Sequence, residues 1–297
     1  MLEFAVPISI FGAALTWLLA SPRVAEPIYR RVLFEPSRHP QGDWSMSWVN
    51  GREYRDVSFL TATGHRLHGW LFPRNDAKVT LLVHHGNAGN IADLHVLLSL
   101  LLTMPANVLV YDYRGYGKSE SSPSVAGVCE DAIAAYDFVA TNLPRVPIVQ
   151  YGESLGGALA CYVALRRRTA GLILQSAFAD IRSIAIDSYP IFALWPRSLF
   201  ALPFYDNREA VRQFDGPLLL LHGKLDKDVP RAHANALFNA ASEPKHLEML
   251  DNTAHSEIDS QDFNLFRGNV SRFIEGLDRD MKRLRTQEAS ATLLAVR

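Results

Sequence analysis

A serine stands in the segment Gly152-Glu153-Ser154-Leu155-Gly156, which fits the pattern G-x-S-x-G. The apolar run P-I-V-Q-Y precedes it, and an apolar stretch with helical spacing follows it. Small neighbours allow a sharp strand-to-helix turn that presents the serine hydroxyl as a nucleophile. The amide of Leu155, at the start of the helix, is placed to stabilise an oxyanion. Ser154 is therefore the predicted nucleophile; a glycine-rich helix start that serves packing alone is the alternative.

A histidine and two carboxylates follow the serine at the ends of two predicted strands. His255 lies in a loop after the run K-H-L-E-M-L, while Asp226 and Asp228 follow the run P-L-L-L-L-H. Active sites of parallel α/β sheets form at the carboxyl ends of the strands. We expect His255 to act as the base and an aspartate to orient it and stabilise its charged form. Asp226 lies nearer the strand end and is favoured over Asp228, which could instead cap the next helix.

The segment from His84 to Asn90, H-H-G-N-A-G-N, follows another apolar run. A glycine-rich turn at this place lets a backbone amide approach the substrate closely. Asn87 is the favoured second oxyanion donor, and Ala88 is the alternative. Asn90 is expected to cap a helix, and His85 is expected to be structural. None of these residues requires a metal or an organic cofactor, so neither is predicted.

The composition of the chain limits the classes of protein to which it can belong. The chain has 297 residues, 48% of them hydrophobic and 21% charged, and a formal net charge of −1. These values are typical of a globular protein with a sizeable core and do not favour nucleic acid as a partner. Two cysteines, Cys129 and Cys161, are too few for a disulfide framework and form no metal-type cluster, so packing roles are expected for both.

Strand-like and helical segments alternate from about residue 55 to about residue 278. This alternation predicts an α/β fold with a mostly parallel sheet covered by helices on both faces. Two period-2 segments separated by Gly64 predict a hairpin. The last helix is expected over about 261–278. An interval rich in aromatic residues and proline interrupts the alternation and predicts a small lid at about 178–215.

Several motifs together resemble those of small-lid α/β-hydrolase-domain serine hydrolases: H-G-N-A-G-N, Y-D-Y-R-G-Y-G-K-S, G-E-S-L-G-G, H-G-K-L-D-K-D-V-P and a late A-H. That group includes membrane-tethered lipases and acyl-protein thioesterases and is similar to the catalytic domain of prolyl oligopeptidases. The resemblance covers roughly residues 55–275. It implies the α/β-hydrolase fold, the triad given above and a structural role for residues 112–115, whereas the lid and the N-terminal segment lie outside these motifs. We expect an eight-stranded sheet and a short helical lid.

The first segment differs from the rest of the chain. Residues 4–20 carry no charge, and Arg23, Arg30 and Arg31 follow them. We expect a single membrane anchor with the catalytic domain on the cytoplasmic side. A signal peptide, which would make the protein secreted or periplasmic, is one alternative. A helix docked on the protein or lying along a membrane surface is the other.

The predicted organisation has four parts. An N-terminal hydrophobic segment covers residues 1–22, and a linker that is irregular after Arg31 covers 23–54. The hydrolase domain covers 55–278, and a frayed or disordered tail covers 279–297.

The predicted function is that of a serine hydrolase acting on a carboxylic ester or thioester with a hydrophobic acyl or leaving group, through an acyl-enzyme. A small-molecule or lipid-like substrate is the expected partner. A peptidase similar to prolyl oligopeptidases is one alternative, although no acidic motif in the lid announces a site for a peptide amino terminus. A non-catalytic binding protein on the same fold is the other alternative. Activity is expected to rise through about pH 6 to 7, because the histidine base must be neutral.

Overall fold

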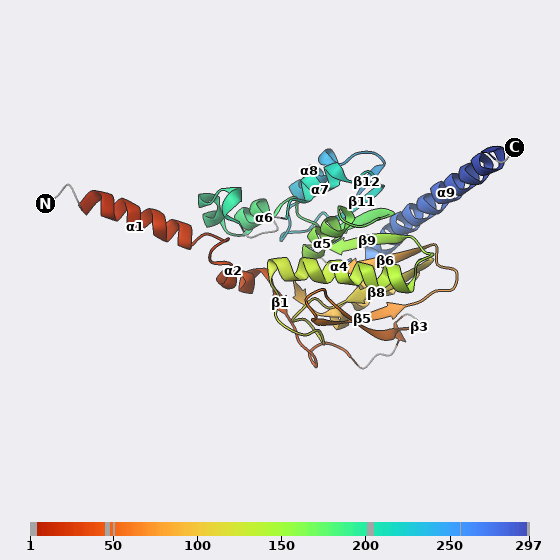
Figure 1. Ribbon diagram of the computed structural model, residues 1–297, viewed down its shortest axis with the longest axis horizontal. Helices are drawn as coiled ribbons and strands as arrows, with labels where there is room; N and C mark the ends of the chain where they lie inside the picture. The colour runs from red at the N-terminus through yellow and green to blue at the C-terminus, as the bar shows by residue number, and fades with distance from the viewer. Residues whose placement is uncertain (1–4, 45–47, 50, 201–204, 256, 296–297) are drawn as a thin grey trace.

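The computed structural model describes residues 5–44, 48–49, 51–200, 205–255 and 257–295. A mostly parallel, eight-stranded sheet forms the centre of this described part, and only the pairs β8–β5 and β5–β4 are antiparallel (Figure 1). The predicted sheet is therefore confirmed. In sheet order its strands are β12 (Lys245–Leu250), β11 (Leu218–Gly223), β10 (Gly171–Gln175), β9 (Ile148–Glu153), β6 (Val79–His84), β8 (Ala106–Tyr111), β5 (Arg66–Phe72) and β4 (Arg55–Leu60).

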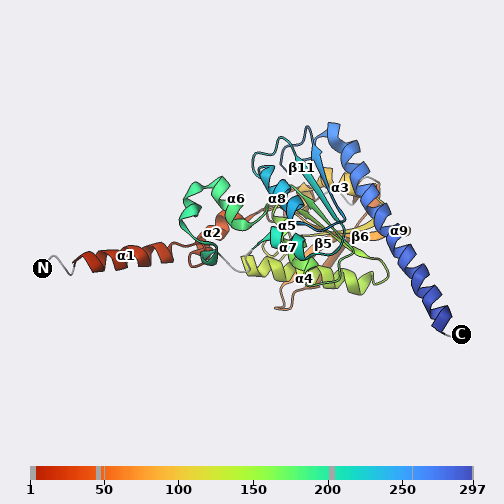
Figure 2. The same cartoon turned by 90° about the horizontal axis from the view of Figure 1, so that it is seen from above.

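The central strands are apolar runs because helices cover both of their faces. All residues of β6 are buried, and their side chains alternate between the two faces. Leu81 and Val83 pack into one core cluster, whereas Leu82 packs into another. One face is covered by α3 (His95–Leu101) and α9 (Phe263–Ala295). The other face is covered by α4 (Val125–Asn142), α5 (Leu155–Ala164), α7 (Asn207–Gln213) and α8 (Ala232–Ala240) (Figure 2).

The predicted hairpin is the antiparallel pair of β4 and β5 at one edge of the sheet. Gly64 lies in its turn with a φ of 85°, a conformation that glycine adopts without steric cost. The strand pair therefore forms where the two period-2 segments were found.

The interval predicted as a lid contains short helices. They are α6 (Ile181–Ser188), η2 (Pro190–Leu194) and η3 (Arg197–Leu199), followed by α7. Residues 201–204 lie outside the described residues. Ala210 and Val211 of α7 are buried in the core beside α5 and α8, so α7 belongs to the helical layer of the sheet. The part that covers the site is therefore α6 with η2 and η3.

The N-terminal segment contains structure that the sequence analysis did not predict. After α1 (Ala5–Leu19), the helix α2 (Glu26–Leu33) occupies part of the predicted linker. Pro27 in its first turn and two arginines in its last turn are ordinary helix signals. The short strand β1 (Glu35–Pro36) then pairs with β7 (Ala88–Gly89), next to the predicted oxyanion turn. Two further short strands, β2 (Trp48–Val49) and β3 (Arg52–Glu53), pair with each other.

The two ends of the chain project from opposite sides of the body (Figures 1 and 2). The last helix was predicted to end at about residue 278, which was wrong, because α9 continues to Ala295 through the segment expected to be frayed or disordered. At the other end, the first four residues of the predicted anchor lie outside the described residues. Across the residues that the structure describes, none of the helices has both the length and the apolar character that crossing a bilayer requires.

Candidate active site

Ser154 lies at the sharp turn between β9 and α5, as the motif predicted. Its φ is 51°, in the left-handed region that non-glycine residues rarely adopt. Gly156 explains how the turn can be so tight. A Cβ at that position would lie 2.0 Å from the carbonyl oxygen of His84, so only glycine allows α5 to pack this closely on β6. Strain at a serine held in this way is typical of functional sites.

The structure brings Ser154, His255 and Asp226 into one hydrogen-bonded chain. Ser154 Oγ lies 3.0 Å from His255 Nε2, and His255 Nδ1 lies 2.8 Å from Asp226 Oδ2. The other oxygen of Asp226 accepts hydrogen bonds from the amides of Asp228 and Val229 at 3.0 and 2.8 Å. The side chain of Asp226 is fully buried, whereas Asp228 is exposed. Of the two candidate carboxylates, Asp226 is therefore the one that holds the histidine.

Burial and charge act in opposite directions on this pair. Burial disfavours the charged form of His255, but the hydrogen bond and the negative charge of Asp226 outweigh it, so the pKa of His255 is raised above its usual value. Burial also opposes ionisation of Asp226, yet its hydrogen bonds from His255 and the Val229 amide keep the pKa of this carboxyl below its usual value. The aspartate is thus ionised and favours protonation of the histidine, as a general base requires.

The predicted oxyanion donors lie beside the nucleophile. Leu155 is the first residue of α5, where backbone amides lack a carbonyl partner one turn earlier. Asn87 and Leu155 line the same cavity as Ser154. The carbonyl of Asn87 accepts hydrogen bonds from the Glu35 amide at 2.9 Å and the Tyr116 hydroxyl at 2.6 Å, which fix the turn. Ala88, the alternative donor, belongs to β7 and is not among the residues that line the cavity.

Other residues of this turn have the structural roles expected of them. The side chain of Asn90 accepts a hydrogen bond from the Ala92 amide at 2.8 Å and so caps the 3-10 helix η1 (Ile91–Asp93). His85 is buried and stacks on the ring of Tyr113. The Tyr113 hydroxyl in turn donates to the carbonyl of His85 at 2.6 Å. These contacts place residues 112–115 beside the oxyanion turn, as the family resemblance implied.

Three residues that support the histidine loop were not singled out from the sequence. Asp262 is buried and accepts hydrogen bonds from the Asn252 amide and the Thr253 hydroxyl, both at 2.8 Å. A Cβ on Gly223 would lie 2.2 Å from the carbonyl oxygen of Thr253, so glycine lets the loop pack on the end of β11. His222 is buried with Nε2 3.6 Å from Asp226 Oδ2. His222 and Gly223 begin the motif H-G-K-L-D-K-D-V-P, which was quoted without a role for either residue.

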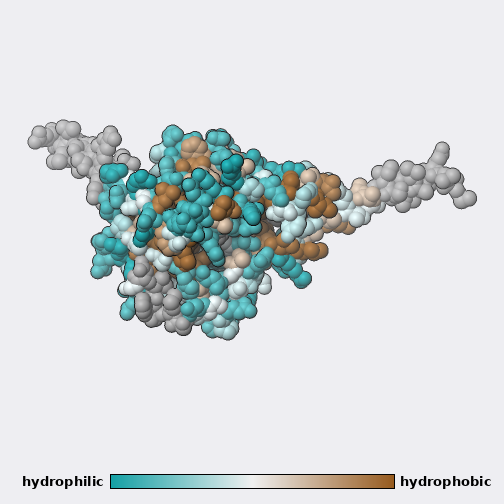
Figure 3. Space-filling view, turned by 180° about the vertical axis from the view of Figure 1, so that it is seen from behind, coloured by the Kyte–Doolittle hydropathy of each residue, from teal (hydrophilic) through white to brown (hydrophobic). Residues whose placement is uncertain are grey.

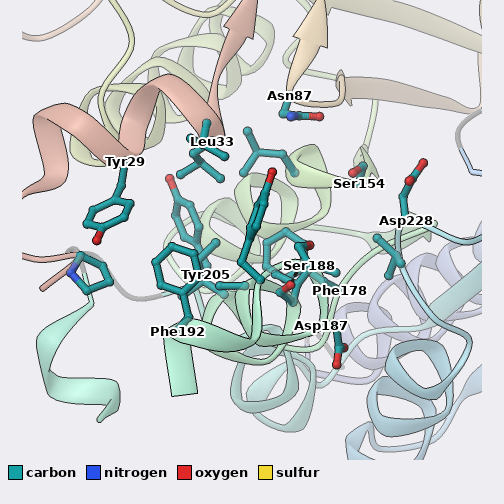
Figure 4. Close-up of a pocket in the computed structure, with 18 of the residues that line it drawn as sticks. Tyr29, Leu33, Asn87, Ser154, Phe178, Asp187, Ser188, Phe192, Tyr205 and Asp228 are labelled. Carbon is teal, nitrogen blue, oxygen red and sulfur yellow. Dashed lines mark hydrogen bonds between the residues drawn. The ribbon is translucent and has the colours of Figure 1, made fainter. Parts of the chain in front are cut away.

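The site opens into a cavity of about 780 Å³ between the lid and the N-terminal helix α2. Figure 4 shows Ser154 and Asp228 at one end of this cavity, with Tyr29 and Phe192 toward the other end. Its walls are mostly apolar, with charged side chains such as Glu26, Arg30 and Lys227 among them. The walls include Leu33 of α2, Val125 of α4, Phe178, Ile181 and Ile184 of the lid region, and Tyr205. A cavity of this size and character suits a substrate with a hydrophobic portion.

Within the described residues, one group of side chains has ligand atoms close enough together to hold a metal ion. It consists of Asp226, Asp228 and His255. Two of these three side chains already hydrogen bond to each other. The group is therefore a hydrogen-bonded pair, His255 and Asp226, with the exposed carboxylate of Asp228 beside it.

Comparison with known proteins decides the family. A family model described as "Serine aminopeptidase, S33" matches residues 75–202. YfhR of Escherichia coli K12 is 35% identical, with coverage of 67% of this chain and 72% of the relative. The α/β-hydrolase domain-containing protein WAV2 of Arabidopsis thaliana is 33% identical, with coverage of 64% of this chain and 67% of the relative. This chain is an α/β-hydrolase.

Solved structures of other proteins share the architecture of this α/β-hydrolase. The Pyrococcus furiosus esterase Pf2001 superposes with a TM-score of 0.68 at 20% identity, covering 82% of this chain and 97% of the esterase. An esterase domain from a Rhodothermus marinus protein superposes with a TM-score of 0.58 at 24% identity, covering 74% and 97% of the two chains. At these identities the likeness establishes the α/β-hydrolase fold, and the chemistry must be argued from the site.

Proposed function

We propose that this α/β-hydrolase is a serine esterase or thioesterase whose substrate carries a hydrophobic acyl or leaving group. The observation that carries the proposal is the hydrogen-bonded chain from Ser154 Oγ through His255 to Asp226 at the end of an apolar cavity. This constellation activates a serine hydroxyl for attack on an acyl carbonyl. The esterases of the same fold lend the proposal further support.

In the proposed reaction, Ser154 Oγ attacks the carbonyl carbon while His255 Nε2 takes the hydroxyl proton. The negative charge that develops on the carbonyl oxygen is stabilised by the amides of Leu155 and Asn87. Collapse of the tetrahedral intermediate breaks the ester or thioester bond, and His255 returns the proton to the leaving oxygen or sulfur. Water then attacks the acyl-enzyme with His255 as its base, and the carboxylic acid and free serine are released.

A series of p-nitrophenyl esters from acetyl to palmitoyl tests this function. The apolar cavity predicts that kcat/KM rises with chain length to a maximum, because each buried methylene contributes about 0.8 kcal/mol until the cavity is filled. Acyl-thioesters of matched length tell the two leaving groups apart. Absence of turnover with every ester and thioester, in a folded sample, would contradict the proposal.

The raised pKa of His255 predicts the pH dependence of this reaction. The neutral histidine is the base, and a raised pKa keeps the ring protonated to a higher pH. We therefore expect kcat/KM for a soluble ester to rise with pH around a midpoint above the ordinary histidine pKa of about 6.5. Initial rates between about pH 5 and pH 9, read at a wavelength insensitive to nitrophenol ionisation, measure the midpoint. A flat profile would argue against His255 as the base.

A peptidase is the second candidate, and one feature of the cavity favours it. Asp187 of α6 lines the cavity, and His233 Nε2 lies 2.8 Å from its carboxylate. A fixed carboxylate in the lid is the group needed to bind a peptide amino terminus, and the matching family model is described as a serine aminopeptidase. Aminoacyl p-nitroanilides test this candidate. It is supported over the first if wild type hydrolyses them and Asp187→Asn does not, while Asp187→Asn still hydrolyses esters.

A further inference from the structure

Exposed apolar side chains gather at one end of the molecule. Of the fifteen large apolar side chains that are exposed among the described residues, ten lie within residues 15–32 or 189–194. The first segment covers the end of α1 and most of α2, and the second covers η2 of the lid. Figure 3 shows apolar side chains where the projecting N-terminal helix leaves the body. Single exposed apolar residues are ordinary on proteins, but such a concentration marks an interaction site.

The two segments form one surface, which we name the apolar end face (residues 15–32 and 189–194). Trp17 Nε1 donates to the carbonyl of Leu194 at 3.1 Å, and Trp195 Nε1 donates back to the carbonyl of Trp17 at 2.9 Å. The rings of Tyr29 and Phe192 meet edge to face with their centroids 5.3 Å apart. These contacts join the N-terminal helices to the lid, although Trp17 and Leu194 are 177 positions apart in the sequence.

The apolar end face rims the cavity that contains Ser154. Val32 of α2 and Tyr189 of the lid are exposed apolar residues, and both line the cavity. Figure 4 shows α2 and the lid on opposite sides of the cavity, with Ser154 deeper inside. Suppose that a partner is bound to this face and that a molecule passes from the partner into the cavity. This molecule would then reach Ser154 without crossing bulk water.

The charge around the face indicates the kind of partner. Residues 15–32 and 189–194 contain three arginines, Arg23, Arg30 and Arg31, and one acidic residue, Glu26, in a chain whose net charge is −1. Arg23 and Arg31 are exposed beside the apolar side chains. Apolar helices with basic residues at their border bind the interface of anionic membranes. A second copy of the chain would instead bring two positive surfaces together, which is unfavourable.

We propose that the apolar end face docks on the surface of an anionic lipid bilayer and that the acyl substrate enters the cavity from that bilayer. The docking is inferred from the apolar end face alone, and only the entry of substrate rests on the proposed function. The apolar side chains enter the boundary between headgroups and acyl chains, while the arginines contact the phosphates. The mouth of the cavity then faces the lipid.

Co-sedimentation of the full chain with vesicles tests the docking. The probes are phosphatidylcholine vesicles with and without phosphatidylglycerol. The triple variant Ile28→Asp, Ile191→Asp, Leu194→Asp removes exposed residues of the face, while Leu60→Asp is the matched control, since Leu60 is exposed to 60% and Leu194 to 61%. We expect wild type and Leu60→Asp to bind the anionic vesicles. The triple variant should bind at least about tenfold more weakly.

Activity separates docking from catalysis. Wild type and triple variant should hydrolyse dissolved p-nitrophenyl butyrate equally, whereas only wild type should hydrolyse a palmitoyl ester held in vesicles efficiently. Ser154→Ala should bind vesicles like wild type. The inference is overturned if the triple variant still binds vesicles as wild type does. It is also overturned if wild type forms a dimer in lipid-free solution and the triple variant does not. If wild type does not hydrolyse dissolved p-nitrophenyl butyrate, the proposed function is refuted and the docking inference stands.

Discussion

Ser154→Ala is expected to lower kcat for ester hydrolysis by a factor on the order of 10⁶, because no other group in the chain of hydrogen bonds can form the acyl-enzyme. The stability should change little, since alanine meets the same backbone strain at a φ of 51° as serine does. Initial rates with a p-nitrophenyl ester measure the loss, and thermal unfolding checks the fold. Labelling by a fluorophosphonate probe should disappear with the activity.

The chain offers a matched control for this experiment. Ser176 follows β10, has a φ of 48° and is buried, and its Oγ makes no hydrogen bond within the described residues. It thus shares the strained backbone of Ser154 but does not line the cavity. Ser176→Ala should keep its activity to within about twofold. Fluorophosphonate labelling that survives in Ser154→Ala would show that another residue is the nucleophile.

Asp226→Asn is expected to lower kcat by about 10⁴, because an amide cannot stabilise the imidazolium and favours the wrong histidine tautomer. The reason lies in the geometry: Asp226 Oδ2 lies 2.8 Å from His255 Nδ1 in a fully buried position. Steady-state rates at the pH optimum measure the effect. The affinity for a substrate-like inhibitor should change little, since the carboxylate does not face the cavity.

Asp228→Asn is the control for this second variant. The side chain of Asp228 is exposed, and its charge helps to raise the pKa of His255. Its removal should leave kcat within about threefold and move the midpoint of the pH profile to a lower pH. An equal loss of activity in the two variants would show that the assignment of the acid to Asp226 is wrong.

Much of the fold and of the site followed from the sequence because each element carried a local signal. Strands buried on both faces are continuous apolar runs, and the serine turn needs small residues at fixed positions. The position of Asn87 followed from its place after a strand. These signals lie within a few residues of the group that they predict.

The contacts that were missed join segments far apart in the sequence. Asp262 supports a loop about ten residues away, and β1 pairs with β7 across some fifty residues, so no short pattern announces either contact. The helix α2 had its own signals in Pro27 and two arginines, but residues 23–54 were interpreted as a linker, with an irregular stretch rich in proline, glycine and tryptophan after Arg31. The end of α9 was placed too early because the polar tail lacks an apolar period.

The position of α2 and β1 has a practical consequence for anyone preparing this enzyme. Trimming the N-terminus to improve yield would remove Leu33, a wall of the acyl cavity, and Glu35, whose amide holds the turn that carries Asn87. A shortened enzyme could keep its nucleophile and still report the wrong chain-length preference. We therefore expect the N-terminal segment to contribute to the choice of substrate, and substrate screens on truncated protein to describe a different catalyst.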